Sequence, residues 1–177
     1  MDELTGLPTH RDLPEALAGL RGGAPSAGLT AIFFDIDGLI WVNDQHGHIE
    51  GDSVLNRVGR RLDSRAQQVH GTAFRIAGDE FLFLLPEHSL EDAAALARDV
   101  VSECERLRIS YAKRDDPRDF LALNAVVFVA PQGFEHQIAN LRDACAQAIY
   151  DAKCAGERQY SLVAVMDRCN LSGPPAV

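Results

Sequence analysis

The segment TAFRIAGDEFLFLL (72–85) constrains the fold most strongly, because two apolar runs flank the pair Gly78-Asp79. A glycine-containing pair between two such runs predicts a tight β-hairpin, which is antiparallel by construction. Strand and helix patterns alternate along the rest of the chain. The sequence therefore predicts an α/β sandwich (α+β), with a mixed, largely antiparallel central sheet flanked by helices. A doubly wound parallel fold is not expected.

Hydrophobic spacing and breaker residues place the other elements. The expected strands cover 29–36, 120–130 and 159–165; the helices 11–20, 38–46, 52–68, 89–107 and 135–155; and a loop 110–119. The length of 177 residues suits one domain, which we place at 1–166, followed by a flexible tail at 167–177.

Charge and composition exclude several functions. A net charge of −9 argues against a nucleic-acid-binding surface. The chain contains no run of eighteen apolar residues and no signal-peptide pattern, so we expect no membrane contact by this domain. Scattered cysteines without a C-x-x-C pair predict free thiols and a cytoplasmic location. These cysteines are Cys104, Cys145, Cys154 and Cys169.

Acidic residues stand at the end of the first strand and at the hairpin bend. Asp35 and Asp37 point to one face of their strand, while Asp79 and Glu80 follow the turn glycine. If the hairpin pairs beside strand 29–36, these carboxylates repel one another unless a cation binds, and oxygen ligands suit Mg²⁺. Alternatively, Asp35 caps the following helix and Gly78-Asp79 is only a turn.

A nucleotide-binding pattern follows the first acids. The backbone N–H groups at the start of helix 38–46 are suited to phosphate. Further along, Asn43 and Asp52 match a guanine edge: the carboxylate accepts from N1–H and the exocyclic amine, and the amide donates to a ring acceptor. Alternatively, Asp52 is the N-cap of helix 52–68.

Four motifs in collinear order resemble the GGDEF family, the diguanylate cyclases, over residues 2–165. DELTGLPTHR resembles the family's opening D-x-L-T-G-L-x-N-R-R. FDIDGLIWVNDQHGHIEGDSVL resembles D-x-D-x-F-K-x-x-N-D-x-x-G-H-x-x-G-D-x-x-L. RIAGDEF carries the signature, with alanine for its first glycine, and AIYDAKCAGER resembles A-L-Y-x-A-K-x-x-G-R-N.

The resemblance implies a nucleotidyl-cyclase-like or polymerase-palm-like fold and a two-domain active site. There, two GTP molecules condense into cyclic di-GMP and two pyrophosphates leave. Motif matching implies that Asp35, the Ile36 carbonyl and Asp79 hold Mg²⁺ (or Mn²⁺), and that Glu80 helps activate the hydroxyl. It also assigns guanine to Asn43, Asp52 and Leu55, and the phosphates to Lys153 and the backbone of Gly38, Leu39 and Ile40. Such domains commonly follow a sensor, so the chain is expected to be the C-terminal part of a longer protein.

Several positions depart from the family pattern. Alanine at 77 would cost about 1 kcal/mol if that position required a positive φ. Ile40 stands at a lysine position of the family and Glu157 at its arginine position, with Arg158 one residue later. A hydrogen bond to a charged group contributes about 1.5–3 kcal/mol, so two lost cations would weaken triphosphate binding by about 3–6 kcal/mol.

The departures also bear on regulation. The family's R-x-x-D inhibitory site reads Gln68 and Gly71 here, so we expect product inhibition at the active site itself. Cyclic di-GMP keeps guanine but lacks pyrophosphate, so the missing cations should penalise it less than GTP. Asn124 and Ala146, at two other departures, are interpreted as packing residues. His46 and His48 are assigned no metal.

Two functions remain open from the sequence. The first is an active diguanylate cyclase. The second is a catalytically weak or inactive receptor for cyclic di-GMP or GTP, which Ile40 and Glu157 favour. A purely structural dimerisation module would not explain the acids and Asn43 at family spacing.

Overall fold

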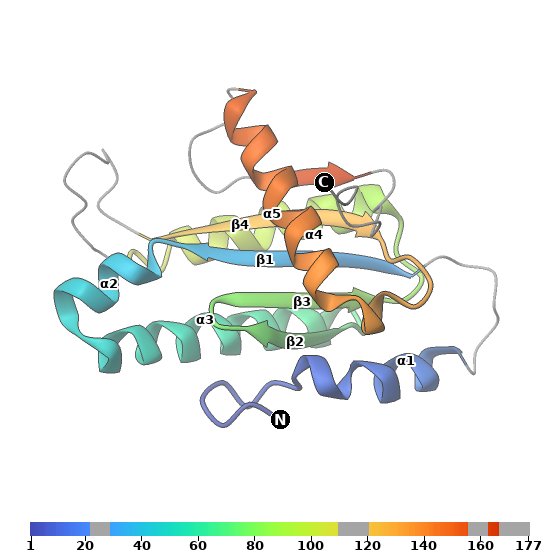
Figure 1. Ribbon diagram of the computed structural model, residues 1–177, viewed down its shortest axis with the longest axis horizontal. Helices are drawn as coiled ribbons and strands as arrows, with labels where there is room; N and C mark the ends of the chain where they lie inside the picture. The colour runs from blue at the N-terminus through green and yellow to red at the C-terminus, as the bar shows by residue number, and fades with distance from the viewer. Residues whose placement is uncertain (22–28, 110–120, 156–162, 167–177) are drawn as a thin grey trace, which may run out of the picture.

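The computed structural model describes residues 1–21, 29–109, 121–155 and 163–166. Within them, five strands form one sheet in the order β2-β3-β1-β4-β5 (Figure 1). The strands are β1 (Thr30–Asp37), β2 (Thr72–Ala77), β3 (Glu80–Leu85), β4 (Ala122–Val129) and β5 (Val163–Met166). Neighbouring strands are antiparallel except β4 and β5, which are parallel. The predicted mixed, largely antiparallel sheet is confirmed.

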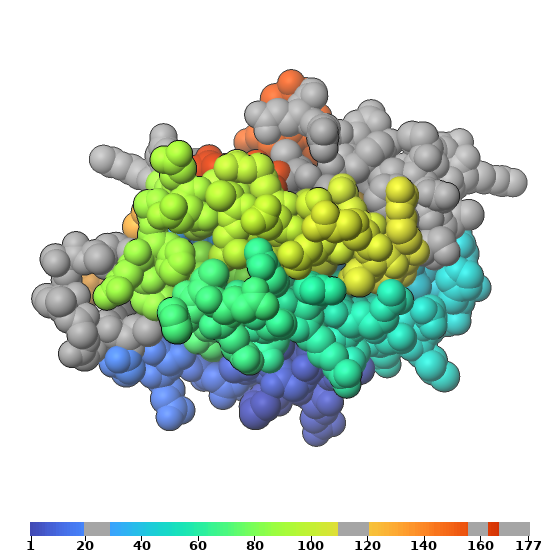
Figure 2. All heavy atoms as spheres, turned by 180° about the vertical axis from the view of Figure 1, so that it is seen from behind, coloured from blue at the N-terminus to red at the C-terminus, as the bar shows by residue number. Residues whose placement is uncertain are grey.

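Helices cover both faces of this sheet. The helices are α1 (Leu13–Arg21), α2 (Leu39–His46), α3 (His48–Gln68), α4 (Leu90–Glu105) and α5 (Ile138–Cys154), with 3₁₀ turns η1 (His10–Asp12) and η2 (Phe134–His136). One apolar cluster joins the sheet to α2, α3 and α4, and a second joins it to α1 and α5. Figure 2 shows the face formed by α3 and α4, opposite the α5 face seen in Figure 1.

The central strand β1 shows how alternation fixes the two faces. The side chains in the α3–α4 cluster are Ile32, Phe34 and Ile36, and those in the α5 cluster are Ala31 and Phe33. The ring of Phe34 meets that of Phe83 edge to face, with 4.9 Å between centroids. By the same alternation, Asp35 and Asp37 lie on the α5 face at the carboxyl end of the strand.

The start of α3 differs most from the predicted helix boundaries. Helix α3 begins at His48 with Gly47 as its N-cap, whereas the sequence predicted a break extending to Gly51. Gly47 has a φ of 84° and alone separates α2 from α3, because Gly51 adopts ordinary helical geometry. The predicted loop at 110–119, the tail at 167–177 and the first part of the last strand lie outside the described residues.

Two sequence-based expectations, on the state of the cysteines and on membrane-spanning helices, can be compared with the structure. Cys104, Cys145 and Cys154 are free thiols as predicted, and Cys169 lies outside the described residues. Within the described part of the chain, no helix combines the length and apolar character needed to cross a membrane.

Candidate functional site

Acidic residues meet at one end of the sheet. The Cα atom of Asp35 lies opposite that of Glu80 in the antiparallel pairing of β1 with β3. The N–H of Ile36 donates a hydrogen bond of 3.2 Å to the carbonyl oxygen of Asp79, which precedes β3. The prediction that the end of the first strand and the hairpin bend are neighbours in space is therefore confirmed.

The hairpin bend itself is formed by Gly78 and Asp79, as predicted. Gly78 has a φ of 35°, and a side chain there would meet nothing within 4 Å. Ala77 does not have a positive φ, so the cost of about 1 kcal/mol considered for alanine at this position does not arise. The bend tolerates alanine at position 77 because the positive φ is adopted by Gly78, which corresponds to the second glycine of the family signature.

The pKa of Asp35 is raised from its ordinary 3.8 to about 6. Burial of the carboxyl group is the largest cause, and the negative charges of Asp79, Asp37 and Glu80 add to it. A hydrogen bond with Asn124 acts in the opposite direction. The ionised form of Asp35 is therefore disfavoured, and a cation beside it would offset both its burial and the neighbouring negative charges.

Asn124 is a residue whose contribution the sequence analysis missed. It is fully buried on β4, opposite Asp35 in the pairing of β1 with β4. The sequence analysis interpreted it as a packing residue, whereas its hydrogen bond with Asp35 gives it a part in the electrostatics of the site. The signal was available, because Asn124 is the one polar residue in the apolar run 121–130.

The residues present fit a magnesium ion. The expected ligands, the Asp35 and Asp79 carboxylates and the Ile36 carbonyl, are all oxygen donors on the paired ends of β1 and the hairpin. Among the described residues, no three His, Cys, Asp or Glu side chains form a metal-binding group by themselves. Mg²⁺ typically uses one or two carboxylates and completes its shell with phosphate and water.

Helix α5 contributes two cations to the acidic end of the sheet. Lys153 Nζ donates to Asp37 Oδ2 at 3.1 Å, and Arg142 Nε donates to Glu80 Oε2. The two cations are eleven positions apart, about three helical turns, so they lie on one face of α5. The sequence analysis found Lys153 from its motif but missed Arg142, for which this spacing was the available signal.

The expected purine-binding residues lie at the junction of α2 and α3. Asn43 Oδ1 lies so close to Gly51 that a Cβ atom built there would be 1.8 Å from it. Asp52, the next residue, is exposed in the second turn of α3. It is therefore not the N-cap of that helix, which is Gly47. The structure places Asn43 against the residue that precedes Asp52 and removes the capping explanation for Asp52.

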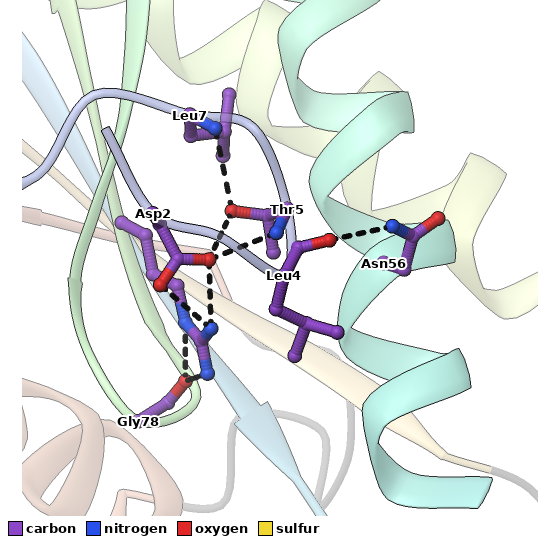
Figure 3. A network of polar contacts seen from close by, with 7 residues as sticks. Asp2, Leu4, Thr5, Leu7, Asn56 and Gly78 are labelled. Atoms are coloured by element: carbon purple, nitrogen blue, oxygen red, sulfur yellow. Dashed lines mark hydrogen bonds and ion pairs between the residues drawn. The ribbon is translucent and has the colours of Figure 1, made fainter. Parts of the chain in front are cut away.

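Apolar side chains lie on α3 close in sequence to Asp52. Leu55 is 6% exposed and belongs to the α3–α4 cluster, with Leu4 packed against that cluster from the N-terminal loop. Asn56 Nδ2 donates to the Leu4 carbonyl at 2.7 Å, which fixes this loop on α3 (Figure 3). The face of α3 that carries Leu55 thus packs against the first residues of the chain.

The start of α2 offers backbone donors beside the acids. Gly38 is its N-cap with a φ of 106°, and its carbonyl accepts from Trp41 and Val42. The N–H groups of Gly38, Leu39 and Ile40 therefore stand outside the helix's own hydrogen-bond ladder, as an anion site requires. Leu39 is buried in the core, while the Ile40 side chain is 64% exposed.

A polar network ties the N-terminal loop to the hairpin bend. Arg75 donates from Nε and Nη2 to the Gly78 carbonyl at 2.9 and 2.7 Å, and from Nη1 to Asp2 at 2.9 and 3.1 Å. Asp2 in turn accepts from the backbone and hydroxyl of Thr5, both at 2.8 Å (Figure 3). Burial acts to raise the pKa of Asp2, but the hydrogen bonds from Thr5 and Arg75 outweigh it, so the pKa of Asp2 is lowered.

Comparison with known proteins settles the family. The sequence model of the family described as "Diguanylate cyclase, GGDEF domain" matches residues 1–159. The chain belongs to the GGDEF family. It is 34% identical over 161 residues to the uncharacterized protein YhcK of Bacillus subtilis (strain 168), covering 89% of this chain and 44% of that protein. It is 30% identical over 169 residues to the diguanylate cyclase DosC of Escherichia coli (strain K12), covering 92% and 35%.

Solved GGDEF domains share the fold. The GGDEF domain of DgcB from Caulobacter crescentus, in complex with c-di-GMP, superposes with a TM-score of 0.72 at 20% identity, covering 93% of this chain and 94% of that one. The active GGEEF domain of a diguanylate cyclase from Vibrio cholerae gives 0.68 at 26% identity, covering 92% and 99%. The predicted cyclase-type, palm-like fold is confirmed. This chain spans less than half the length of the curated relatives named above.

The departures from the GGDEF pattern can now be placed. The degenerate signature Ala77-Gly78-Asp79-Glu80-Phe81 forms the bend and the first residues of β3. Glu157 and Arg158 lie outside the described residues. Gln68 ends α3 and Gly71 follows it, so neither residue of an R-x-x-D pair is present before β2.

Proposed function

We propose that this chain is a diguanylate cyclase domain that condenses two GTP molecules into cyclic di-GMP and two pyrophosphates. The convergence of Asp35, Asp79 and Glu80 beside the start of α2, in a member of the GGDEF family, carries the proposal. Each domain binds one GTP, and two domains face each other. The 3′-oxygen of one GTP bonds to the α-phosphorus of the other as its bond to pyrophosphate breaks.

The residues divide the work by chemistry. Asp35, the Ile36 carbonyl and Asp79 would hold Mg²⁺ or Mn²⁺, which supplies positive charge at the reacting phosphate. The Glu80 carboxylate would accept the proton of the attacking hydroxyl. Its partner Arg142 holds it in orientation from α5.

Binding of the triphosphate combines backbone and side-chain donors. The N–H groups of Gly38, Leu39 and Ile40 and the Lys153 ammonium face the phosphates. Arg142 adds a second positive charge on the same face of α5. The described part of the site therefore has two cations, although the exposed Ile40 stands where the family has a lysine.

Guanine recognition falls to the junction of α2 and α3. Asp52 accepts from N1–H and the exocyclic amine, Asn43 donates to a ring acceptor, and Leu55 lies against the base. Cyclic di-GMP carries the same guanine edge, so the product inhibits at this site. An R-x-x-D site, whose positions are occupied by Gln68 and Gly71, is not involved. We place the reaction in the cytoplasm, where GTP is available.

Pyrophosphate release from purified protein with GTP and Mg²⁺ tests the proposal. The wild type is expected to release pyrophosphate, and Asp79→Asn to be slower by about 100-fold or more, because charge stabilisation by a metal contributes several kcal/mol. Asp99→Asn is the matched control, since Asp99 is 71% exposed on α4. Equal rates for Asp79→Asn and the wild type would overturn the assignment of the metal site.

A second candidate function is a receptor that binds cyclic di-GMP without making it. The 64% exposed Ile40 at a cation position favours it, because an uncharged sec-butyl side chain cannot neutralise phosphate. A receptor would release no more pyrophosphate than Asp79→Asn, yet would bind cyclic di-GMP in isothermal titration in a manner that Asp52→Ala abolishes. Pyrophosphate release that depends on Asp79 excludes this function as the whole role of the domain.

A further inference from the structure

Gly51 makes room for the asparagine of the base-binding junction. A Cβ atom at Gly51 would lie 1.8 Å from Asn43 Oδ1 and 2.9 Å from Asn43 Cγ, so a side chain at position 51 would force the end of the Asn43 side chain to move. The Asn43 oxygen therefore lies almost where the β-carbon of any other residue would be. Since Gly51 has helical geometry without a positive φ, no backbone strain calls for glycine at this position.

The orientation of the carboxamide follows from this contact. Of its three terminal atoms, Oδ1 and Cγ are nearest to Gly51, and Nδ2 is farthest, at 3.4 Å from the built Cβ position. The oxygen is thus turned toward the α3 backbone and the NH₂ group away from it. An asparagine whose acceptor is directed into the protein presents a donor to a ligand.

The helix junction holds Asn43 at this place. The Gly47 N–H donates to the Asn43 carbonyl at 2.8 Å, and the Gly51 N–H donates to the Gly47 carbonyl at 3.3 Å. These bonds bring the last turn of α2 against the first turn of α3, with Asp52 next in the chain. The Asn43 side chain therefore lies against the residue that directly precedes Asp52.

We propose that Gly51 is a positioning residue for guanine specificity: its missing side chain lets Asn43 present an amide donor beside the Asp52 carboxylate. The inference rests on the proposed function, because it assigns a supporting residue to the guanine site. Alanine at 51 would displace the short Asn43 side chain without removing any group that itself bonds to the base.

The test compares five variants by isothermal titration with cyclic di-GMP and with a GTP analogue bearing a methylene between its α- and β-phosphorus atoms. The variants are Gly51→Ala, Asn43→Ala, the double variant of these two, Asp52→Ala and Gly19→Ala. We expect Gly51→Ala and Asn43→Ala each to bind about tenfold more weakly, the loss of one neutral hydrogen bond. The double variant should bind no more weakly than Asn43→Ala, because the two changes remove the same interaction.

Stability separates positioning from misfolding. Gly19→Ala is the matched control: Gly19 lies inside α1, and a Cβ there meets nothing within 4 Å. Alanine is a better helix former than glycine, so neither glycine variant should unfold at lower urea concentration than the wild type. If Gly51→Ala does not fold, the double variant has no clashing atoms and still allows comparison with Asn43→Ala.

The outcomes distinguish this inference from the proposed function. Full affinity in Gly51→Ala, together with a loss in Asn43→Ala, overturns the role of Gly51 and leaves the guanine site standing. A double variant weaker than Asn43→Ala by a further tenfold also overturns it, because Gly51 would then act independently of Asn43. Unchanged affinity in both Asn43→Ala and Asp52→Ala overturns the guanine site itself.

Discussion

Replacing Asp35 by asparagine should stabilise the protein when no divalent metal is present. The folded-state pKa of Asp35 is raised from 3.8 to about 6, chiefly by burial and by the charges of Asp79 and Asp37. The folded protein therefore binds a proton at this group more tightly than the unfolded chain does, and its free energy of unfolding falls as pH rises from about 4 to about 6. Above that window the ionised carboxylate costs about 3 kcal/mol, which asparagine avoids.

Urea unfolding in EDTA measures this effect. Asp35→Asn should exceed the wild type in free energy of unfolding by about 3 kcal/mol at pH 7.5, and by little at pH 4, where the wild-type carboxyl is largely protonated. Asp99→Asn loses an ion pair in which the 71% exposed Asp99 lies 3.8 Å from Arg65. Its free energy of unfolding should differ from that of the wild type by less than about 1 kcal/mol. A gain equal at both pH values would refute the reasoning, because packing rather than charge would explain it.

Magnesium should remove most of this difference in stability. A cation that binds only the folded state stabilises it by about 2.7 kcal/mol at one hundred times its dissociation constant. We expect added Mg²⁺ to stabilise the wild type and to leave Asp35→Asn nearly unchanged, since a metal ligand is missing. Equal stabilisation of both proteins would show that the ion binds elsewhere.

Three further changes test the groups around the site. Arg142→Met should slow pyrophosphate release about tenfold by freeing the Glu80 carboxylate, and Arg142→Lys should restore part of the rate; unchanged rates would remove Arg142 from the site. Lys153→Met should weaken binding of the methylene GTP analogue about tenfold and binding of cyclic di-GMP by less, as measured by isothermal titration. Equal losses of affinity for the two ligands would contradict a role of Lys153 in binding the triphosphate. Asp2→Asn should lower the free energy of unfolding by about 1–3 kcal/mol in urea, since its contact with Arg75 is charged and mostly buried; no change would mean that the loop is not held by this pair.

The sequence predicted the sheet because local signals and long-range pairing agreed. The glycine-containing bend at Gly78-Asp79 could only be antiparallel, and the long apolar runs could only be interior strands. Strand order and register then followed from burying both faces of β1, which no local pattern specifies. Alternation along β1 was nevertheless sufficient to place Asp35 and Asp37 on one face.

The sequence analysis erred where a residue's effect depends on a partner in another helix or strand. Gly51 was interpreted as a helix breaker because glycine weakens helices in general, and its contact with Asn43 on another helix cannot be seen in local spacing. Arg142 and Asn124 were missed for the same reason. Each acts on an acid, Glu80 or Asp35, that is far away in sequence and adjacent only after the sheet has formed.

The charges around the acids bear directly on the choice between cyclase and receptor. Counted from motifs alone, the site had lost two of three phosphate cations, which favoured a receptor. The fold adds Arg142 on the same face of α5 as Lys153, and each of these cations already contacts an acid of the site. Metal bound at Asp35 and Asp79 would add positive charge beside Asp37, which would weaken the hold of Asp37 on Lys153 and leave the Lys153 ammonium for the phosphate. A chain that binds triphosphate in this way should therefore depend on Mg²⁺ for GTP binding far more than for cyclic di-GMP binding, and equal dependence would favour the receptor.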